Sequence, residues 1–397
     1  MKIKLTPWLG QNNIWDEYDL RFTPTSERQV PVTAAVNVDW DVGGKAYLRP
    51  GSTLAKAGTA YKSAFPFGSH CLIQDGGTLY KADTSFNLTS LETGLSSSLA
   101  FEYVEYGGQV YMTNSEVCRR FTSAGNLLNW GMTVPPVATL GTTAGSLDQA
   151  TYRVTCTLVD ASGVESGAPK AAELTTSGAI TVDLSSMDSN ATHVNIYAAR
   201  GDLPELYWNQ KVAVGALPAT ITDVQVSDRV LRNKYLRGPI PGSNVFSHFG
   251  YLMLCKDNFV FRSRGQAPHL FHPRSEILTF PSDVQGGGSV RDGFYIATSG
   301  GLFWISGSEP VKWFATRKDD TAYAKGMFRF PGRYFPELNT DDTVVAFGYK
   351  GGVAFGLPSG IVRYVTHDRL RLASTPSQIS MLYRENNAIH QLLMLGT

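Results

Sequence analysis

The stretch LIQDGGTLY, residues 72–80, decides the fold of this chain. Apolar and polar residues alternate on both sides of Gly76-Gly77, as they do in strands that bury one face. A glycine pair suits a tight hairpin turn, because glycine adopts positive φ without steric cost. The pattern returns as YVEYGGQVY at 103–111, and variants of it occur at 245–254, 294–305, 344–355 and 379–393.

The recurring hairpins and the scarcity of helical periodicity predict an all-β protein. Hairpins that return every few tens of residues are typical of small antiparallel sheets stacked or arranged around an axis. An irregular β-propeller closes such sheets into a ring and protects their edges. The sequence contains no WD or kelch motif, so an irregular β-sandwich is the alternative architecture.

The middle of the chain differs in composition, with more Thr, Ser, Ala and Val between the proline clusters at 135–136 and 239–241. Its alternating segments predict about seven strands in roughly 100 residues, each with one buried and one wet face. That size and rhythm predict an inserted immunoglobulin- or fibronectin-like β-sandwich domain. The expected division is 1–134 for the first part of the propeller, 135–238 for the insert and 239–397 for the second part of the propeller.

The charge balance is close to neutral, with 35 Lys and Arg against 34 Asp and Glu. Proteins that grip DNA through its phosphates usually carry a basic excess, so tight DNA binding is not expected. Weak basic clusters are expected to be solubilising surface groups or mild electrostatic guides for a duplex. They are Arg119-Arg120, Arg262 with Arg264, and Arg363 with Arg369 and Arg371.

The N-terminus lacks the apolar core of a signal peptide, and no run approaches the ~20 apolar residues that cross a bilayer. Synthesis in a cytoplasm without membrane insertion is therefore expected. The cysteines are far apart, form no CxxC pair and fall in predicted strands, which favours buried thiols in a reducing compartment. They are Cys71, Cys118, Cys156 and Cys255.

Candidate metal and catalytic groups are scarce. His269 and His272 lie between prolines, where we expect a structural loop rather than a metal site. The pairs Asp39 with Asp41, Asp319-Asp320 and Asp341-Asp342 are expected to be solvated, and Gly286-Gly287-Gly288 to form a flexible turn. The sequence has no Gly-x-Ser-x-Gly elbow and no P-loop. We predict that the chain has no catalytic residues, binds no cofactor and is not an enzyme.

The first 51 residues contain GQNN at 10–13, AAVNVDWDVGG at 34–44 and YLRPG at 47–51. This pattern resembles the opening of bacteriophage tail proteins of the nozzle, or packaged-DNA stabilisation (tail hub), family. Residues 152–166 and 193–197 are similar to the fibronectin-like inserts of that family, and several segments between 245 and 307 to its propeller blades. The residues that carry the family motifs, expected to be structural, are Asn37, Asp39, Arg49, Pro50, Gly51, Gly163, Glu165, Ser166, Asp292 and Gly293.

The resemblance implies a structural tail component that forms a ring below the portal and adaptor, with a hexamer as one candidate form. The ring would continue the DNA exit channel and help to retain packaged DNA. Its implied partners are copies of itself, the portal or adaptor, other tail proteins and passing double-stranded DNA in weak contact. The implied location is the virion tail, after synthesis in a bacterial host cytoplasm. Which residues would contact DNA stays unknown.

Two other functions stay open. A carbohydrate- or receptor-binding module of the virion would use aromatic side chains, and exposure of Trp8, Trp130 or Trp208 near a groove would favour it. A propeller-type hydrolase would need carboxylates that converge at the mouth of the axis, and the sequence offers no such set.

Overall fold

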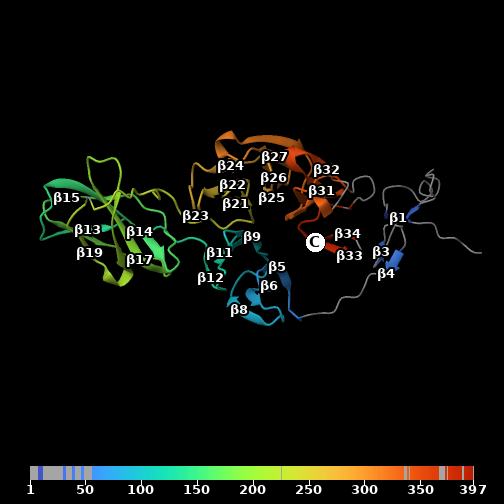
Figure 1. Ribbon diagram of the computed structural model, residues 1–397, viewed down its shortest axis with the longest axis horizontal. Helices are drawn as coiled ribbons and strands as arrows, with labels where there is room; N and C mark the ends of the chain where they lie inside the picture. The colour runs from blue at the N-terminus through green and yellow to red at the C-terminus, as the bar shows by residue number, and fades with distance from the viewer. Residues whose placement is uncertain are drawn as a thin grey trace, which may run out of the picture.

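The computed structural model is built almost entirely of β-strands (Figure 1). It describes residues 56–224, 226–334, 338, 340–365, 372, 374–386 and 389–396, together with four short strands before residue 50. These four strands pair by their backbones, two in parallel and two antiparallel. They are β1 (Trp8–Gln11) with β2 (Val30–Val32), and β3 (Val38–Trp40) with β4 (Ala46–Leu48). The prediction of an all-β protein is confirmed.

Five small antiparallel sheets follow one another along the chain, and we call them ring sheets one to five. Ring sheet one contains β5 (Tyr61–Phe67), β6 (His70–Asp75), β7 (Thr78–Ala82) and β8 (Leu88–Glu92). Ring sheet two contains β9 (Glu102–Tyr106), β10 (Gln109–Thr113), β11 (Cys118–Phe121) and β12 (Leu127–Asn129). Ring sheet three contains β20 (Asn244–His248), β21 (Tyr251–Lys256), β22 (Phe259–Arg264), β23 (Ala267–Phe271) and β24 (Ile277–Thr279).

The C-terminal part of the chain completes this set. Ring sheet four contains β25 (Val284–Val290), β26 (Gly293–Thr298), β27 (Gly301–Ser306) and β28 (Phe314–Asp319). Ring sheet five contains β29 (Phe328–Pro331), β30 (Thr343–Tyr349), β31 (Gly352–Gly356) and β32 (Val362–Tyr364). A last hairpin pairs β33 (Ile379–Asn386) with β34 (Ile389–Gly396). Short 3-10 turns are η2 (Pro310–Lys312), η3 (Gly332–Tyr334) and η5 (Pro358–Gly360). No helix in the described part of the chain is long and apolar enough to cross a membrane.

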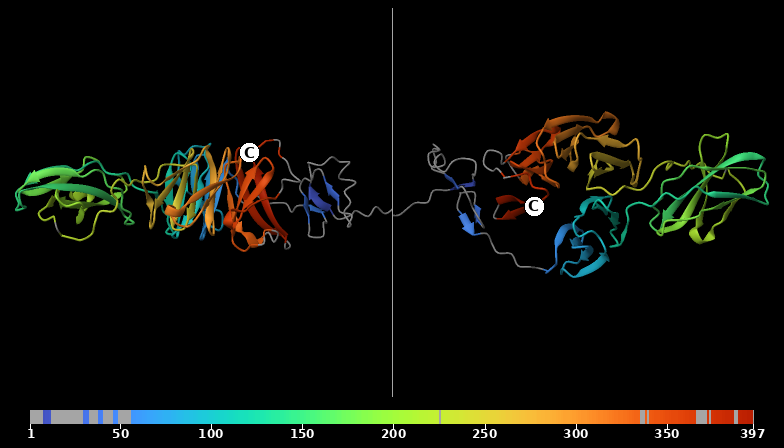
Figure 2. Two further views of the ribbon diagram at one scale, coloured as in Figure 1. Left: turned by 90° about the horizontal axis from the view of Figure 1, so that it is seen from above. Right: turned by 180° about the vertical axis from the view of Figure 1, so that it is seen from behind.

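The ring sheets lie around an open middle in a propeller-like arrangement (Figures 1 and 2). Their first strands approach one another in sequence order, with β9 in contact with β5 and β20, and β20 in contact with β25. β25 in turn contacts β30, and β29 contacts β33. The first strand of each of these sheets therefore faces the middle of the ring.

Glycine turns join the hairpins at the expected places. Gly76 has φ +56° between β6 and β7, and Gly107 has φ +58° between β9 and β10. A residue with a side chain is disfavoured at such φ values, so glycine permits the tight connections. All six hairpins expected from the sequence are present as strand pairs.

Both faces of ring sheets two, three and four are buried, because each of them packs between two others. On β21, Leu252 and Leu254 pack against ring sheet two, whereas Met253 and Cys255 pack against ring sheet four. Successive side chains of a strand point to opposite faces, so adjacent residues enter two different cores. This double burial explains the continuous apolar runs in these strands.

The expectation of a flexible turn at Gly286-Gly287-Gly288 is wrong. These glycines lie inside β25, and all three are buried. A Cβ atom at Gly287 would lie 2.3 Å from Cε1 of Phe246 in the neighbouring sheet. The glycines therefore let ring sheets three and four approach closely, a role that a strand glycine can have besides a turn.

Seven strands between residues 139 and 221 form a separate two-sheet unit. Its first sheet has the order β13-β16-β19 and its second the order β15-β14-β17-β18. The two sheets share one core, which includes Val154, Ile180 and Ile196. The first strand pairs with the fourth, unlike the immunoglobulin order, in which the first and second strands share a sheet. The bounds are β13 (Thr139–Thr143), β14 (Ala150–Asp160), β15 (Ala172–Thr176), β16 (Ala179–Asp183), β17 (Ala191–Arg200), β18 (Tyr207–Ala213), β19 (Ala219–Ile221) and the 3-10 turn η1 (Val214–Ala216).

The solvent-exposed face that the sequence predicts for each strand of this unit is buried on two central strands, β14 and β17. Thr155 and Thr157 of β14 are buried, and so are Asn195 and Tyr197 of β17. A second apolar cluster, which includes Leu206 and Leu231, covers that face. The connecting loops fold back over the sheet, and alternation in a single strand does not reveal such a cover.

A buried junction attaches the two-sheet unit to ring sheets two and three. Arg120 of β11 and Asp160 of β14 form a buried ion pair. His269 Nε2 of β23 lies 3.1 Å from the Glu165 carbonyl oxygen of the two-sheet unit. The Trp130 indole joins ring sheets two and three beside this contact, by donating a hydrogen bond to the Pro268 carbonyl over 2.9 Å. The unit projects outward from the ring at this junction (Figure 2).

Candidate functional site

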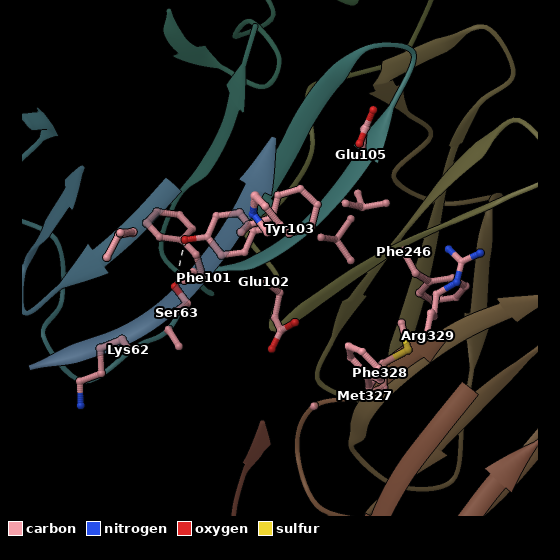
Figure 3. A pocket seen from close by; sticks show the side chains of 18 of the residues that line it. Lys62, Ser63, Phe101, Glu102, Tyr103, Glu105, Phe246, Met327, Phe328 and Arg329 are labelled. Carbon is pink, nitrogen blue, oxygen red and sulfur yellow. Dashed lines mark hydrogen bonds between the residues drawn. The ribbon is translucent and has the colours of Figure 1, made fainter. Parts of the chain in front are cut away.

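The middle of the ring contains a cavity of about 1200 Å³, which we call the axial cavity. Ring sheets one, two, three and five all contribute to its wall. In Figure 3 the side chain of Glu102 projects into the open space, and Arg329 lies beside Phe246 and Met327. The cavity therefore combines lone charges with an apolar wall.

Aromatic contacts hold one side of the axial cavity. Phe65 of β5 and Tyr103 of β9 stack with ring centroids 5.3 Å apart. The Tyr103 hydroxyl lies 2.9 Å from the Ser63 hydroxyl, and Phe101 packs against Tyr103 at 6.0 Å. Burial raises the pKa of Tyr103, so the phenol is neutral and serves as a hydrogen-bonding wall residue.

Glu102 is one of two acidic residues that line the axial cavity, the other being Glu105. Glu102 begins β9, where the alternation of side chains directs it to the cavity while Phe101 enters the core between ring sheets one and two. Its carboxylate has no hydrogen bond or ion pair among the residues that the structure describes. Close packing around the half-buried side chain disfavours the charged form and raises its pKa to about 7.

Arg329 is one of three basic residues that line the axial cavity, the others being Lys56 and Lys62. Arg329 lies on β29 and borders both the axial cavity and a smaller pocket of about 300 Å³. Desolvation by the surrounding protein lowers the pKa of Arg329, although its side chain is exposed to water. Within the described ranges Arg329 has no carboxylate or carbonyl partner. By contrast, Arg291 at the same small pocket forms a 2.8 Å ion pair with Asp342.

A histidine–serine pair lies beside the smaller pocket. His248 Nδ1 is 2.8 Å from the Ser289 hydroxyl, and His248 Nε2 is 3.1 Å from the Gly307 carbonyl oxygen. The ring is buried and packs against Phe294 at 4.8 Å, and burial lowers the pKa of His248. These bonds join ring sheet three to ring sheet four, which is a structural link between neighbours.

The structure places the sequence-predicted motif residues in separate regions. Asn37, Arg49, Pro50 and Gly51 lie outside the described residues, and Asp39 belongs to the backbone of β3. Gly163 lies in the turn after β14 with φ +80°. The Ser166 hydroxyl accepts a hydrogen bond from the Leu158 amide over 2.9 Å.

Glu165 is the best-connected of the motif residues. Its carboxylate accepts hydrogen bonds from Thr157, from Asn195 at 2.9 Å and from Tyr197 at 2.8 Å. Arg229 adds an ion pair at 2.9 Å. Glu165 thus links the covering loops to the face of β14 and β17 that they bury.

Asp292 and Gly293 lie at the turn between β25 and β26. The Asp292 carboxylate accepts hydrogen bonds from the backbone amide and the hydroxyl of Ser359, each at 2.9 Å, which ties ring sheet four to η5. A Cβ atom at Gly293 would lie 2.3 Å from the Ile305 carbonyl oxygen, so the close strand pairing requires glycine.

The cysteines and histidines form no common site. All four cysteines are free, and each lies in a strand as predicted, with Cys156 and Cys255 fully buried. Burial raises the pKa of Cys118 to about 11 and that of Cys156 to about 12, which keeps the thiols protonated. The prediction of a loop at His269 is wrong, because this residue lies on β23. The described residues contain no group of three or more potential metal ligands.

Three further expectations need correction. Arg120 is buried in an ion pair rather than solvated, because it meets Asp160 at the junction. Asp319 is not a solvated turn residue, since its carboxylate accepts hydrogen bonds from Tyr323 at 2.6 Å and from Tyr364. Trp130, a candidate for sugar stacking, has no exposed surface. Trp208 is half-buried, with its indole nitrogen 3.4 Å from Asn195 Oδ1.

Sequence reasoning missed Glu102 and Arg329. Both belong to short strands in which charged and aromatic residues alternate, so the pattern indicates a solvated face. Only the arrangement of the ring sheets around a common middle turns that face toward the axial cavity.

Comparison with known proteins identifies no family. No family model matches the chain, and no curated protein matches it. Among solved structures, BBS1N in complex with ARL6DN is 10% identical with a TM-score of 0.34, covering 86% of this chain and 92% of that one. A catalytically inactive virginiamycin B lyase from Staphylococcus aureus is 10% identical with a TM-score of 0.32, covering 87% and 97%. AztD from Citrobacter koseri is 10% identical with a TM-score of 0.31, covering 80% and 73%. Likenesses at this level assign this chain neither a family nor an activity.

Proposed function

We propose that this chain is a structural component of a phage tail, acting by assembly rather than by catalysis. Copies of the chain form a closed ring, a nozzle or hub, that continues the DNA exit channel below the portal or adaptor. The propeller-like ring of each copy packs beside its neighbours, and residues 135–238 form an inserted sandwich domain that shares the two-layer architecture of immunoglobulin- or fibronectin-like domains but not the immunoglobulin strand order. The duplex passes in weak contact only, consistent with a formal net charge of +1.

The observation that carries this proposal is the exposed apolar surface on two neighbouring outer strands, which we call the outer patch. Val311 in η2 is 98% exposed, and Phe314 at the start of β28 is 68% exposed. Ile361, Tyr364 and Val365 are exposed at β32. The Tyr364 hydroxyl bonds to Asp319 at the end of β28, so the ends of the two strands approach each other. Clustered exposed apolar side chains are typical of surfaces that other proteins cover.

The buried junction supports the same proposal. An assembled tube needs subunits of constant shape, and the Arg120–Asp160 pair with the hydrogen bond between His269 and Glu165 fixes the insert to the ring. Identical interfaces that repeat around a rotation axis close into a ring. The sequence resemblance to tail nozzle proteins supplies the identity of the assembly, with the virion tail as its location.

The test is the assembly state of the purified full-length chain. Sedimentation velocity and negative-stain microscopy should show closed rings, and a pull-down should capture portal or adaptor protein. Phe314→Lys should shift the chain toward monomers, because it places a charge in the centre of a contact. Val137→Lys, at a residue that is 50% exposed outside the outer patch, is the matched control and should leave the rings intact. A chain that stays monomeric at high concentration and binds neither protein contradicts the proposal.

A further inference from the structure

The last hairpin, β33–β34, is the inner half of a further ring sheet. Ring sheets one to five each contain at least four strands, whereas β33 and β34 pair only with each other among the described strands. β33 contacts β29 of ring sheet five, and the Ile379 amide at its start donates a hydrogen bond to the Lys325 carbonyl over 2.8 Å. β33 therefore has the position of a first strand and β34 that of a second strand.

β34 presents an unpaired edge to whatever lies outside it. The strand is eight residues long, and exposed edges of this length are templates for pairing with another strand. Its sequence is apolar without interruption at 392–395, which is typical of a strand that is covered on both faces. Ring sheet five covers one face only, so the sequence of β34 calls for a second neighbouring sheet.

Ring sheet one has an uncovered apolar face that meets this requirement. Ile73 of β6 pairs with Ala64 of β5 and with Tyr80 of β7, so the three side chains share one face. Ala64 is exposed and the other two are half-buried, whereas the opposite face of the sheet is buried against ring sheet two. Ala64 and Ile73 line the axial cavity together with Ile379 at the start of β33. A complete sheet at β33–β34 would lie between ring sheets five and one.

The hairpin β3–β4 has the form of the outer half of a ring sheet. Residues 41–45 connect β3 to β4, and loops of the same length, 83–87 and 122–126, connect the third strand to the fourth in ring sheets one and two. The residue pairs that flank these loops also correspond: Trp40 with Ala46, Ala82 with Leu88, and Phe121 with Leu127. β3 and β4 therefore match a third and a fourth strand in register as well as in order.

The sequences of the three loops agree. In both ring sheets the first loop residue, Asp83 or Thr122, accepts an amide hydrogen bond through its side chain, and the loop after β3 begins with Asp41. The fourth loop residue has φ +59° at Phe86 and is a glycine with positive φ in ring sheet two. The loop after β3 has Gly44 at this position, where glycine is favoured.

The connection that follows β4 also fits a fourth strand. Residues 49–60 lead from β4 to β5, as residues 93–101 lead from β8 to β9, the first strand of the next sheet. A connection of this length spans at most about 40 Å, so β3–β4 stays near the ring. Figures 1 and 2 show β3–β4 beside β33–β34, on the side away from the middle of the ring.

We propose that β3–β4 docks on the edge of β34 in the same chain and completes a sixth ring sheet in the order β33-β34-β3-β4. This terminal clasp packs between ring sheets five and one and covers the face that contains Ile73. Its partner is the hairpin of the same chain rather than that of a second copy, because the connection 49–60 holds it at an effective concentration in about the millimolar range. The clasp lies inside one copy and does not depend on the proposed ring assembly.

The two complete sheets fix the register of the clasp. In both of them the last residue of the third strand pairs with the second residue of the second strand, as Ala82 does with Cys71 and Phe121 with Val110. The corresponding residues of the sixth sheet are Trp40 and His390. One step further along the antiparallel pair, Asp39 of β3 lies opposite Gln391 of β34.

Disulfide formation in the full-length chain tests this register. Asp39→Cys combined with Gln391→Cys should form an intrachain disulfide on mild oxidation, because directly opposed residues have Cβ atoms about 5 Å apart. Asp39→Cys combined with Arg384→Cys is the matched control. Arg384 pairs with Gln391 from β33, one strand further from β3, at about 10 Å, and should form no disulfide. Non-reducing denaturing gels and mass spectrometry of the linked peptides identify the bonds.

Three results would overturn the proposal: no disulfide in the Asp39–Gln391 variant, an equally rapid disulfide in the control, or a disulfide that joins two chains. The third result would show that copies exchange their hairpins. An intrachain disulfide in a chain that forms no rings would support the clasp and count against the proposed assembly, so the two proposals fail separately.

Hydrogen exchange of the β34 amides is the second measurement. Asp39→Pro should make them exchange about tenfold faster or more, because proline disrupts the pairing of β3. Val30→Pro, the same change in β2, is the matched control and should leave β34 as it is in the unchanged chain. The amides of β14 serve as a reference that reports global unfolding. Unchanged exchange of β34 in Asp39→Pro would contradict the clasp.

Discussion

At the scale of single residues, Glu102 shows the cost of enclosing a charge. Tyr103 and Cys255 lie close enough for the Glu102 charge to raise their own pKa values, and neither offers the carboxylate a positive charge. Arg329 across the cavity is not in contact. The folded chain therefore binds a proton at Glu102 more readily than the unfolded chain does.

This difference predicts a pH dependence of stability. The pKa of Glu102 is about 7 in the folded chain and about 4.5 in the unfolded chain. Between these values the folded state binds more protons, so its free energy of unfolding falls as the pH rises from about 4.5 to about 7 and is then constant. We expect a loss of about 2 kcal/mol from this group, since the half-buried carboxylate keeps some contact with water.

Urea unfolding across this pH range measures the effect. Glu102→Gln should remove this part of the slope and make the chain more stable near neutral pH, whereas Glu116→Gln should keep it. The same slope in both variants would show that Glu102 is not the group responsible.

A second residue-scale prediction concerns close packing at Gly287. Gly287→Ala should lower the free energy of unfolding by about 1 to 3 kcal/mol, because the added methyl group overlaps the ring of Phe246. Gly215→Ala is the control, since a Cβ atom there has no neighbour within 4 Å, and should change stability by less than about 0.5 kcal/mol. Equal effects in thermal melts would argue against tight contact between ring sheets three and four.

At the scale of elements, the junction between β11 and β14 depends on one buried ion pair. Arg120→Met should destabilise the chain by about 3 to 5 kcal/mol, because it leaves the Asp160 charge buried alone. In Asp160→Asn the amide oxygen can still accept the hydrogen bonds from the Ser162 and Val164 amides. The double variant should therefore lose less than the sum of the two single losses.

A double-mutant cycle by urea unfolding measures this coupling. The exposed pair of Arg200 and Asp148, at 3.7 Å, is the matched comparison and should contribute about 1 kcal/mol or less. Additive losses at Arg120 and Asp160 would contradict a coupled pair.

At the scale of secondary-structure elements, sequence-based prediction succeeded for some features and failed for others. Alternation around Gly76 and Gly107 predicted hairpins, because turn geometry and strand period are local properties. The burial of Thr157 and Asn195 was not predicted, since the covering segment near Leu231 is distant in sequence. The glycines of β25 were mistaken for a turn, because only the neighbouring Phe246 explains them. Glu102 and Arg329 belong to one site only once the ring has brought their strands together.

At the scale of the whole molecule, the ends of the two-sheet unit lie next to each other. A Cβ atom at Gly131 would be 2.9 Å from the Cα of Gly238, so the chain leaves the ring and returns at one place. Removal of residues 133–237, with a short Gly-Ser linker, should leave a folded ring. Arg120→Met should accompany the deletion, because Asp160 is removed with the insert.

Circular dichroism and thermal melting test this deletion. We expect a β-sheet spectrum and a cooperative transition. Deletion of residues 100–130, which removes ring sheet two, is the contrasting control and should abolish the transition. A shortened chain without a cooperative transition would show that the insert is part of the ring's own core.

The double burial of ring sheets two, three and four also constrains how such a protein can change in size. Loss of a sheet that packs between two others would expose apolar surface on both of its former neighbours. Such a loss would therefore raise the free energy of the folded chain at two interfaces. Growth carries no such penalty when new sequence enters at an outer connection, as between β12 and β20. We therefore expect natural relatives of this chain to vary in their insertions while the number of sheets around the axis stays constant.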